Sequence, residues 1–259
     1  MKEITLEEQK KIQLKILDDV AQFCESHNIN YFLAYGTLLG AIRHKGYIPW
    51  DDDVDIIMPR PDYDKFMNSF DKVSGSKYST LCEVRDKGYN CCFGKVHDSR
   101  TLFQEEYSRK SSFGIFIDVF PFDGYSSPYQ MKYCNFLTNL LKVKMNVWYN
   151  GRSLIKNIVT YIGKFLLLPL PIRVILKRMD HNAKKLNFKE SDKVCSFFGT
   201  QPIFDRELFE DFTYAQFENK KYRIPKKFEK VLTIEFGDYM KLPHEKDRVF
   251  RHHAKVWWK

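Results

Sequence analysis

The sequence lacks the cysteine patterns that would tie a small domain together. Its six cysteines include no CxxC pair and no histidine at zinc-finger spacing, so neither a zinc ribbon nor a disulfide framework is indicated. We therefore expect reduced and mostly buried thiols. Low-complexity tracts and repeats of solenoid length are also missing, and glycine is scarce, with 12 in 259 residues. With 44% hydrophobic and 16% aromatic residues, the chain is predicted to be a folded globular protein rather than a disordered one.

An apolar signal region is absent as well. The first residues, MKEITLEEQKK, are charged, so we expect a cytoplasmic protein. Acidic residues are fewer than basic ones, 33 against 42, and the formal charge of +9 favours anionic partners. Nucleotides, nucleic acid and an acidic membrane surface all fit this charge, which does not choose among them.

Apolar residues at helical spacing predict several helices. Thr5 and Glu8 have the spacing of a capping box, which places the first helix directly after Thr5. Pro61 suits the first turn of another helix. The expected helices span residues 6–26, 37–43, 61–70 and, with breaks at Gly151, Pro169 and Pro171, most of 128–185.

Short apolar runs between turn residues predict the strands of a mixed sheet, at 31–35, 53–58, 77–84, 91–96 and 114–120. We expect the first strand to enter a tight turn at Gly36 and the last to close at Pro121. The resulting class is α+β, a mixed β-sheet core flanked by helices with a mainly helical insertion. We divide the chain into a core (1–125), a helical basic region (126–190) and a C-terminal segment that completes the core and the site (191–259).

Two aspartates on one expected strand are the most informative feature. Asp53 and Asp55 are two residues apart, and side chains at that spacing in a strand project from the same face. Their oxygens suit Mg²⁺ or Mn²⁺, and two such ions can stabilise both the attacking and the leaving oxygen of a displacement. At Gly36, on the preceding turn, backbone N–H groups can approach a phosphate closely. A solvated acidic loop is the other interpretation, and it suits Asp51 and Asp52 better.

A third carboxylate usually completes a two-metal site. Asp118 is our candidate because the run Ile115–Phe120 surrounds it with apolar residues, and a role at a strand end is the alternative. Arg43, His44 and Lys95 are candidates for holding phosphate charge, because cations stabilise a developing phosphoryl transition state. Each of the three could equally be an ordinary surface residue.

The run YFLAYGTLLGAIRHKGYIPWDDDVDIIMPRPDYDKF resembles the LicD family, the bacterial phosphocholine transferases related to fukutin within the nucleotidyltransferase superfamily. Similar stretches follow at 93–95, 117–121 and 236–240, so the resemblance spans most of the chain and is weak over about 126–188. Phe236 stands where a tyrosine is expected before Gly-Asp. The motifs in the first run are the Gly-Thr turn at Gly36, the Arg43 and His44 pair, the Ile48-Pro49-Trp50 lead-in and the acidic block at 51–55.

The resemblance implies roles for the residues already singled out. Residues 1–125 would form a nucleotidyltransferase-like catalytic core. Gly36 and Thr37 would contact donor phosphates, and Asp118 would be a third metal-site carboxylate or a base. Asp53 and Asp55 would bind Mg²⁺, and the remaining substrate-binding candidates are Arg43, His44, Trp50 and Lys95.

The same resemblance implies the substrates. The donor would be CDP-choline or a related CDP-alcohol, and phosphocholine would pass to a sugar hydroxyl of a teichoic acid, capsule or lipopolysaccharide precursor, releasing CMP. Transfer of phosphoglycerol or phosphoribitol is an alternative, and so is nucleotidyl transfer with the same carboxylates. Choline would need an aromatic cage, for which the sequence offers Tyr35, Trp50, Tyr89, Trp148 and Trp257. Packing in the apolar core is the other interpretation for each of these aromatic residues.

The middle of the chain is basic and apolar. Between Arg152 and Lys185 lie eight Lys or Arg residues and a single acid, Asp180. Such a segment can lie on an anionic bilayer, as a lipid-linked acceptor would favour, but charged residues and prolines keep it from spanning one. A helical layer with a charged outer face is the alternative. A basic nucleic-acid-binding protein is the non-enzyme alternative, but the chain has no RNA-binding or zinc-finger signature and we expect no nucleic acid partner.

Overall fold

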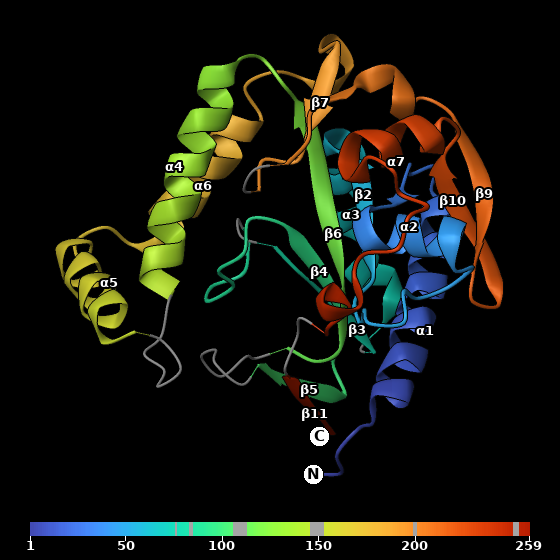
Figure 1. The fold of residues 1–259 in the computed structure, drawn as a ribbon, viewed down its shortest axis with the longest axis horizontal. Coiled ribbons are helices and arrows are strands. Elements are labelled where there is room, and N and C mark those ends of the chain that lie inside the picture. The colour runs from blue at the N-terminus through green and yellow to red at the C-terminus, as the bar shows by residue number, and fades with distance from the viewer. Residues whose placement is uncertain (76, 83–84, 106–112, 146–152, 199–200, 251–253) are drawn as a thin grey trace.

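A mixed β-sheet forms the centre of the molecule (Figure 1). The computed structural model describes residues 1–75, 77–82, 85–105, 113–145, 153–198, 201–250 and 254–259. The main strands run in the order β1–β2–β6–β4–β3, in which β2 and β6 are parallel and the other neighbours are antiparallel. The expected mixed sheet with helices beside it is confirmed. The strand bounds are β1 Phe32–Leu33, β2 Asp55–Pro59, β3 Tyr78–Leu81, β4 Gly94–Asp98 and β6 Phe116–Gly124.

The central strand β6 is longer than its sequence predicted. Its first half pairs with β4, and its last two residues pair with β7 (Lys193–Cys195), which in turn pairs with β8 (Phe204–Asp205). The prediction that this strand closes at Pro121 is wrong. The Asp118 N–H donates toward β2, to Val54 O, so the nitrogen of Pro121, three residues on, faces the opposite side. Pro121 lies there between the β4 and β7 pairings, where a missing N–H removes no ladder bond.

Helices α1 (Leu6–Ser26) and α3 (Arg60–Ser74) pack against each other and against β6. The predicted capping box of α1 is confirmed, because the Glu8 N–H donates to Thr5 Oγ1 at 3.2 Å and the Thr5 N–H donates to the Glu8 carboxylate at 3.0 Å. The rings of Phe23, Phe66 and Phe70 pack together between the two helices. This aromatic core fixes α1 and α3 on the sheet.

The C-terminal segment packs beside α2 (Tyr35–Arg43), and its strand β10 (Lys220–Pro225) also contacts α1 through Tyr222, whose hydroxyl donates to the Asp18 carboxylate at 2.6 Å. Its hairpin of β9 (Phe212–Phe217) and β10 and the helix α7 (Phe228–Phe236) all contact α2 or its neighbour β1. A separate pair, β5 (Thr101–Glu105) with β11 (Ala254–Trp258), was not expected from the sequence. Three short 3₁₀ helices complete the described elements: η1 Phe188–Glu190, η2 Arg206–Phe209 and η3 Glu245–Asp247.

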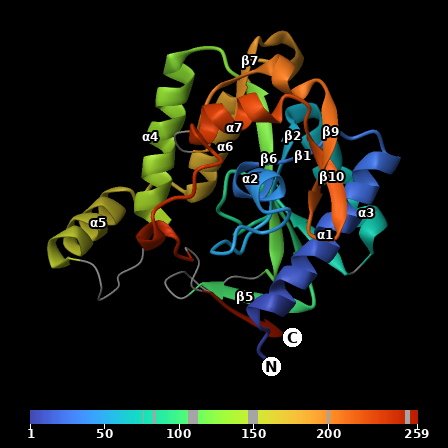
Figure 2. The same cartoon turned by 45° about the vertical axis from the view of Figure 1, so that its right-hand side comes forward.

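The middle of the chain forms a helical layer of α4 (Pro128–Met145), α5 (Leu154–Leu166) and α6 (Ile172–Ala183). Helices α4 and α6 lie side by side, and α5 lies beyond their far end, away from the sheet (Figures 1 and 2). The layer has its own apolar core, separate from that of the sheet. The core of the layer includes Cys134, Leu137, Ile175 and Met179. The mainly helical character expected for this region is confirmed.

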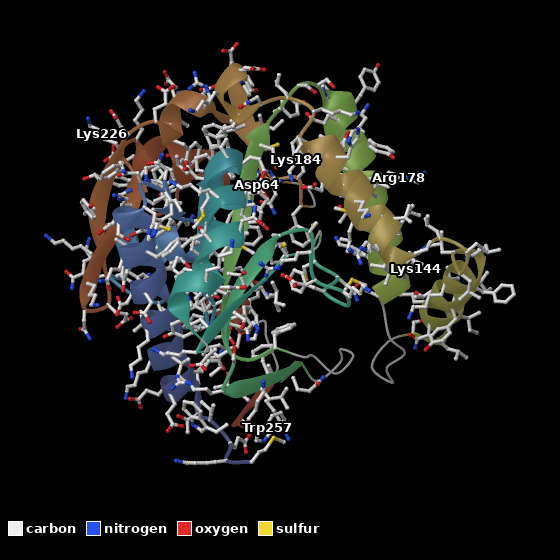
Figure 3. The ribbon with its side chains drawn as sticks, turned by 180° about the vertical axis from the view of Figure 1, so that it is seen from behind. Asp64, Lys144, Arg178, Lys184, Lys226 and Trp257 are labelled. Atoms are coloured by element: carbon white, nitrogen blue, oxygen red, sulfur yellow. The ribbon has the colours of Figure 1, made fainter. Side chains whose placement is uncertain are left out.

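A buried ion-pair cluster joins the helical layer to the sheet. Arg60, at the start of α3, donates to both carboxylate oxygens of Asp123 on β6, at 2.6 and 2.7 Å. Its third contact is to Asp180 on α6, at 3.3 Å. At the edge of this cluster Lys184 and Asp64 face one another at 3.6 Å (Figure 3). A bidentate arginine in such a place sets geometry as well as charge, so α3, β6 and α6 are held in one arrangement.

All six cysteines are free, as the sequence predicted. Cys24, Cys134 and Cys195 are buried, and the other three are half-buried. Burial raises the pKa of each of the three buried thiols above its ordinary value. These cysteines therefore act as small apolar side chains.

Candidate active site

A groove of about 960 Å³ opens beside the start of β2. Its walls come from the first turns of α2, the loop 48–53 and the segment 235–248. The lining combines carboxylates with aromatic and basic side chains, among them Asp51, Asp53, Asp55, Trp50, Tyr239, Arg43 and Arg248. Such a mixture suits a charged ligand that carries phosphate, because cations bind phosphate directly and carboxylates bind it through a metal ion.

Asp55 is the first residue of β2 and is buried. Its backbone is held on both sides: its carbonyl accepts from the Ala34 N–H at 3.0 Å, and its N–H donates to Thr37 Oγ1 at 2.8 Å. Burial, followed by the charges of Asp53 and Asp118, raises the pKa of Asp55 well above its ordinary value. Ionised Asp55 therefore requires a nearby cation, and this position favours a proton or a metal ion.

Asp53 lies in the loop before β2, two residues from the strand. The prediction that Asp53 and Asp55 share one face of a strand is therefore wrong, because β2 begins only at Asp55. Both carboxylates nevertheless line the same groove. Helix α1 holds this loop in place, since the side-chain amides of Gln9 and Gln13 donate to the Asp52 carbonyl at 3.4 and 3.0 Å.

Asp118 lies beside Asp55 in the parallel register of β2 and β6, and opposite Lys95 in the antiparallel register of β6 and β4. The Lys95 ammonium donates to the Asp118 carboxylate in a short ion pair. The same ammonium lies 3.4 Å from the centroid of the Phe116 ring, and Lys95 is buried. Lys95 is therefore not an ordinary surface residue, and its charge offsets part of the carboxylate cluster.

Gly36 lies within the first turn of α2, so the tight turn expected at this glycine is wrong. The left-handed backbone belongs to the preceding Tyr35, with φ +49°, which starts the helix. Glycine is needed here for close approach instead, because an added Cβ would lie 2.6 Å from Asp51 Oδ2.

Asp51 and Asp52 do not form the solvated loop that the sequence suggested. Asp52 is buried, and Asp51 is half-buried and lines the groove. Burial, followed by the charge of Asp53, raises the pKa of Asp51 to about 7. The acidic run thus contributes a further carboxylate to the groove.

The donor chemistry of Asp53 and Asp55 fits a hard divalent cation, since a cation offsets the burial and the repulsion that together raise the pKa of Asp55. Across the described part of the chain, however, no three Asp, Glu, His or Cys side chains are arranged so that they could hold a metal ion. Asp118 is engaged with Lys95. Magnesium commonly takes one or two carboxylates together with substrate phosphates, so Asp53 and Asp55 suffice as the protein's share of such a site.

Comparison with known proteins assigns the family. Residues 28–149, which include Asp53, Asp55 and Asp118, match the family described as LicD/FKTN/FKRP, nucleotidyltransferase domain. The "Lipopolysaccharide cholinephosphotransferase LicD" of Haemophilus influenzae is 30% identical to this chain over 97% of both proteins. The chain belongs to the LicD family. Shorter matches join it to uncharacterized proteins of Rickettsia typhi (42% identity over 22% of this chain and 18% of that one) and Rickettsia prowazekii (33% over 30% and 28%).

The Arg43 and His44 pair that suggested the LicD family stands at the end of α2. Arg43 lines the groove, and its Nη1 donates to the carbonyls of Tyr239 and Lys241 at 2.8 and 3.3 Å. His44 meets Trp50 edge-on, with ring centroids 6.1 Å apart, and is not one of the lining residues. Burial, with Arg43 second, lowers the pKa of His44. Arg43 thus holds the segment 235–248 against α2, and His44 supports Trp50.

Glu235 and Arg248 also line this groove and were not predicted from the sequence. The Arg248 guanidinium lies 5.5 Å from the centroid of the Trp50 ring. Glu235 is half-buried in the groove, and burial raises its pKa to about 7. The available signal was the family-like stretch 236–240, whose Phe236 and Tyr239 line the groove between these two residues.

The aromatic residues named as a cage for choline fall in different places. Tyr35 and Trp50 line the groove. Tyr89 is buried and its hydroxyl donates to the Phe93 carbonyl at 2.8 Å, and Trp257 lies on β11 in the pair with β5 (Figure 3). Trp148 lies outside the described residues. Within the described chain, Tyr35 and Trp50 are the cage candidates that reach this groove.

Proposed function

We propose that this chain transfers phosphocholine from CDP-choline to a sugar hydroxyl of a lipid-linked lipopolysaccharide-type glycan, in a reaction that requires Mg²⁺ or Mn²⁺. The observation that carries the proposal is the groove in which Asp53 and Asp55 meet aromatic and cationic side chains. Membership of the LicD family supports the transferase class, and the name of the Haemophilus influenzae relative, a lipopolysaccharide cholinephosphotransferase, supports the choice of phosphocholine and of the acceptor.

In this proposal the start of α2 binds the donor diphosphate. Asp53 and Asp55 would hold a divalent cation, which would neutralise charge on the diphosphate and on the departing nucleotide. The first N–H groups of a helix have no intrahelical partner, so those of Gly36 and Thr37 can donate to phosphate oxygens. The absence of a Cβ at Gly36 lets the Asp51 carboxylate lie close to the helix start.

Asp118 is the proposed proton acceptor. The acceptor hydroxyl loses its proton to the Asp118 carboxylate as its oxygen bonds to the choline-bearing phosphorus. The bond from that phosphorus to the bridging oxygen breaks, and CMP leaves with the electron pair. Lys95, paired with Asp118, holds this carboxylate in place until the hydroxyl arrives.

The aromatic lining supports the choice of choline. A quaternary ammonium binds over aromatic faces, and the groove offers the rings of Tyr35, Trp50, Phe236 and Tyr239. Asp238 lines the same groove and adds negative charge where a cation would lie. A CDP-alcohol without a positive charge, such as CDP-glycerol or CDP-ribitol, would gain nothing from these residues.

The test is the release of CMP from CDP-choline with Mg²⁺, with lipopolysaccharide precursors as acceptors and mass spectrometry of the product glycan. We expect acceptor-dependent CMP and a glycan heavier by one phosphocholine. Asp53→Ala and Asp118→Ala should each lower the rate by at least roughly 100-fold. Asp211→Ala, at an exposed acid that directly precedes β9 and pairs with Lys226, is the matched control and should retain full activity.

Other products would redirect or refute the proposal. CMP released from CDP-glycerol or CDP-ribitol but not from CDP-choline would keep the chemistry and reject phosphocholine. Pyrophosphate released from CTP, with transfer of a nucleotidyl group, would reject the phosphocholine transfer itself. Full activity in the presence of a strong metal chelator would reject the metal requirement.

A further inference from the structure

Helix α5 presents its apolar face to solvent and its polar face to the protein. Asn157 and Thr160 are 2% and 8% exposed, although both are polar. The outward face of the same helix carries large apolar side chains, with Ile155, Phe165 and Leu166 each more than 70% exposed. Further exposed apolar residues at this face are Leu154, Ile158, Val159, Tyr161 and Ile162, followed by Leu168 just beyond the helix. An ordinary surface helix has the opposite orientation.

Specific contacts hold α5 in this orientation. The Lys144 ammonium, at the end of α4, donates to the Leu167 carbonyl at 2.6 Å and also to the Leu170 carbonyl, which caps the end of α5 (Figure 3). Gly163 faces α4 so closely that an added Cβ would lie 3.1 Å from Val143 Cγ1. The inward face of α5 is therefore a built contact with α4, and the apolar outward face follows from it.

The helical layer that carries α5 is strongly basic. Residues 128–183 contain nine Lys or Arg residues, at 132, 142, 144, 152, 156, 164, 173, 177 and 178, and one acid, Asp180. Lys156 on α5 is exposed, and so are Lys177 and Arg178 on α6, the latter on the outer side of the layer (Figure 3). An apolar stripe beside a concentration of cations is complementary to an anionic bilayer, which offers acyl chains and negative headgroups together.

The geometry also limits how α5 can meet a membrane. Among the described helices, none is long and apolar enough to cross a bilayer. Helix α5 has 13 residues, whereas a spanning helix needs about 20. Pro169 and Pro171 then end the apolar run before α6 begins. A helix of this kind lies in the interface, parallel to the membrane plane.

We propose that α5 is a membrane-docking helix that inserts its apolar face into the headgroup region of an anionic bilayer, with Lys156, Lys177 and Arg178 binding lipid phosphates. A second copy of the chain is the less suitable occupant, because pairing two α5 faces would bring two basic layers together. Docking itself follows from α5 and its neighbours. Its purpose, to bring the groove to a lipid-linked acceptor, rests on the proposed function.

The experiment is flotation of the full chain with vesicles of phosphatidylglycerol and phosphatidylethanolamine, compared with vesicles of phosphatidylcholine alone. The test variant is the triple substitution Ile155→Gln, Val159→Gln and Leu166→Gln, at side chains already in contact with water. Its matched control is Leu6→Gln, an equally apolar exposed side chain on α1. Both proteins are also analysed by circular dichroism and by light scattering after gel filtration.

We expect the wild type and Leu6→Gln to float with anionic vesicles, and to do so more weakly at high salt. The triple variant should bind these vesicles with an affinity at least roughly tenfold lower. The triple variant should keep its fold and its rate of CMP release with a delipidated acceptor. Failure of the wild type to bind anionic vesicles, or equal binding by the triple variant, would overturn the proposal. A wild-type dimer that dissociates in the triple variant, without vesicle binding, would overturn it in favour of a protein interface. Vesicle binding is independent of catalysis, so Asp53→Ala should float like the wild type even if the proposed reaction is wrong.

Discussion

The Thr37 side chain positions Asp55 through one buried hydrogen bond. Thr37 is 2% exposed, and its Oγ1 accepts from the Asp55 N–H at 2.8 Å. Thr37→Val keeps the shape of the side chain and removes the acceptor, so a buried backbone N–H loses its partner. We expect the free energy of unfolding to fall by about 1–3 kcal/mol, the usual cost of an unsatisfied buried donor.

The same change should lower activity more than it lowers donor binding. Without the Thr37 hydroxyl, the start of β2 is free to shift, and a displacement of about 1 Å in a reacting group can cost roughly 100-fold in rate. We therefore expect kcat for CMP release to fall by roughly 10- to 100-fold, with a smaller change in KM for CDP-choline. Thr37→Ser keeps the oxygen and is the matched control, with stability and kcat close to the wild type.

Urea unfolding followed by fluorescence, together with steady-state CMP release, measures both effects on the same preparations. A variant Thr37→Val with unchanged stability and lost activity would mean that the hydroxyl serves the donor rather than Asp55. A variant with unchanged stability and unchanged kcat would refute the argument that this hydrogen bond positions the carboxylate.

Three further substitutions test other parts of the structure. Burial raises the pKa of Glu235 from 4.5 to about 7, so between these pH values the folded state holds a proton that the unfolded state has lost, and stability falls as pH rises. In thermal melts, Glu235→Gln should therefore match the wild type in stability at pH 4 and be more stable by up to roughly 3 kcal/mol at pH 8. An equal difference in stability at both pH values would contradict this expectation. Gly40→Ala would place a Cβ 2.4 Å from the Gly46 carbonyl oxygen and should cost about 1–3 kcal/mol in urea unfolding, where a neutral result would show that the loop yields. Arg60→Ala leaves the buried Asp123 carboxylate unpaired and should lower the free energy of unfolding by about 3–5 kcal/mol at pH 7. The double variant Arg60→Ala with Asp123→Ala should recover part of that loss. No recovery would argue against the ion pair as the cause.

The sequence predicts the features that depend on neighbouring residues. Helix α1 follows from a capping box and a regular apolar spacing, both of which are local, and the structure confirms its bounds. The acidic block was found for the same reason, since Asp53 and Asp55 stand in a short motif shared with the LicD family. Local sequence patterns thus identified residues of the loop 48–53 and of β2 that line the groove.

Features that depend on distant residues were missed or misplaced. The pairing of β5 with β11 joins segments about 150 positions apart, and no local pattern announces it. Arg248 reaches Trp50 across an even larger separation, through contacts that exist only in the folded chain. The end of β6 was misjudged because Pro121 ordinarily stops a strand, and only the change of partner from β4 to β7 makes it harmless there.

Strand β6 has a mechanical consequence for the proposed reaction. It carries Asp118 near one end and Asp123 five residues later, about 17 Å along the same strand at roughly 3.3 Å per residue. Arg60 fastens the Asp123 end to α6, so the helical layer and the carboxylate cluster are joined by one stiff element. With α5 on a bilayer, the height of Asp118 above the lipid would be set by this strand. The distance of a sugar from its lipid anchor would then decide whether its hydroxyl reaches Asp118. This distance would select the modified sugar together with its fit to the groove.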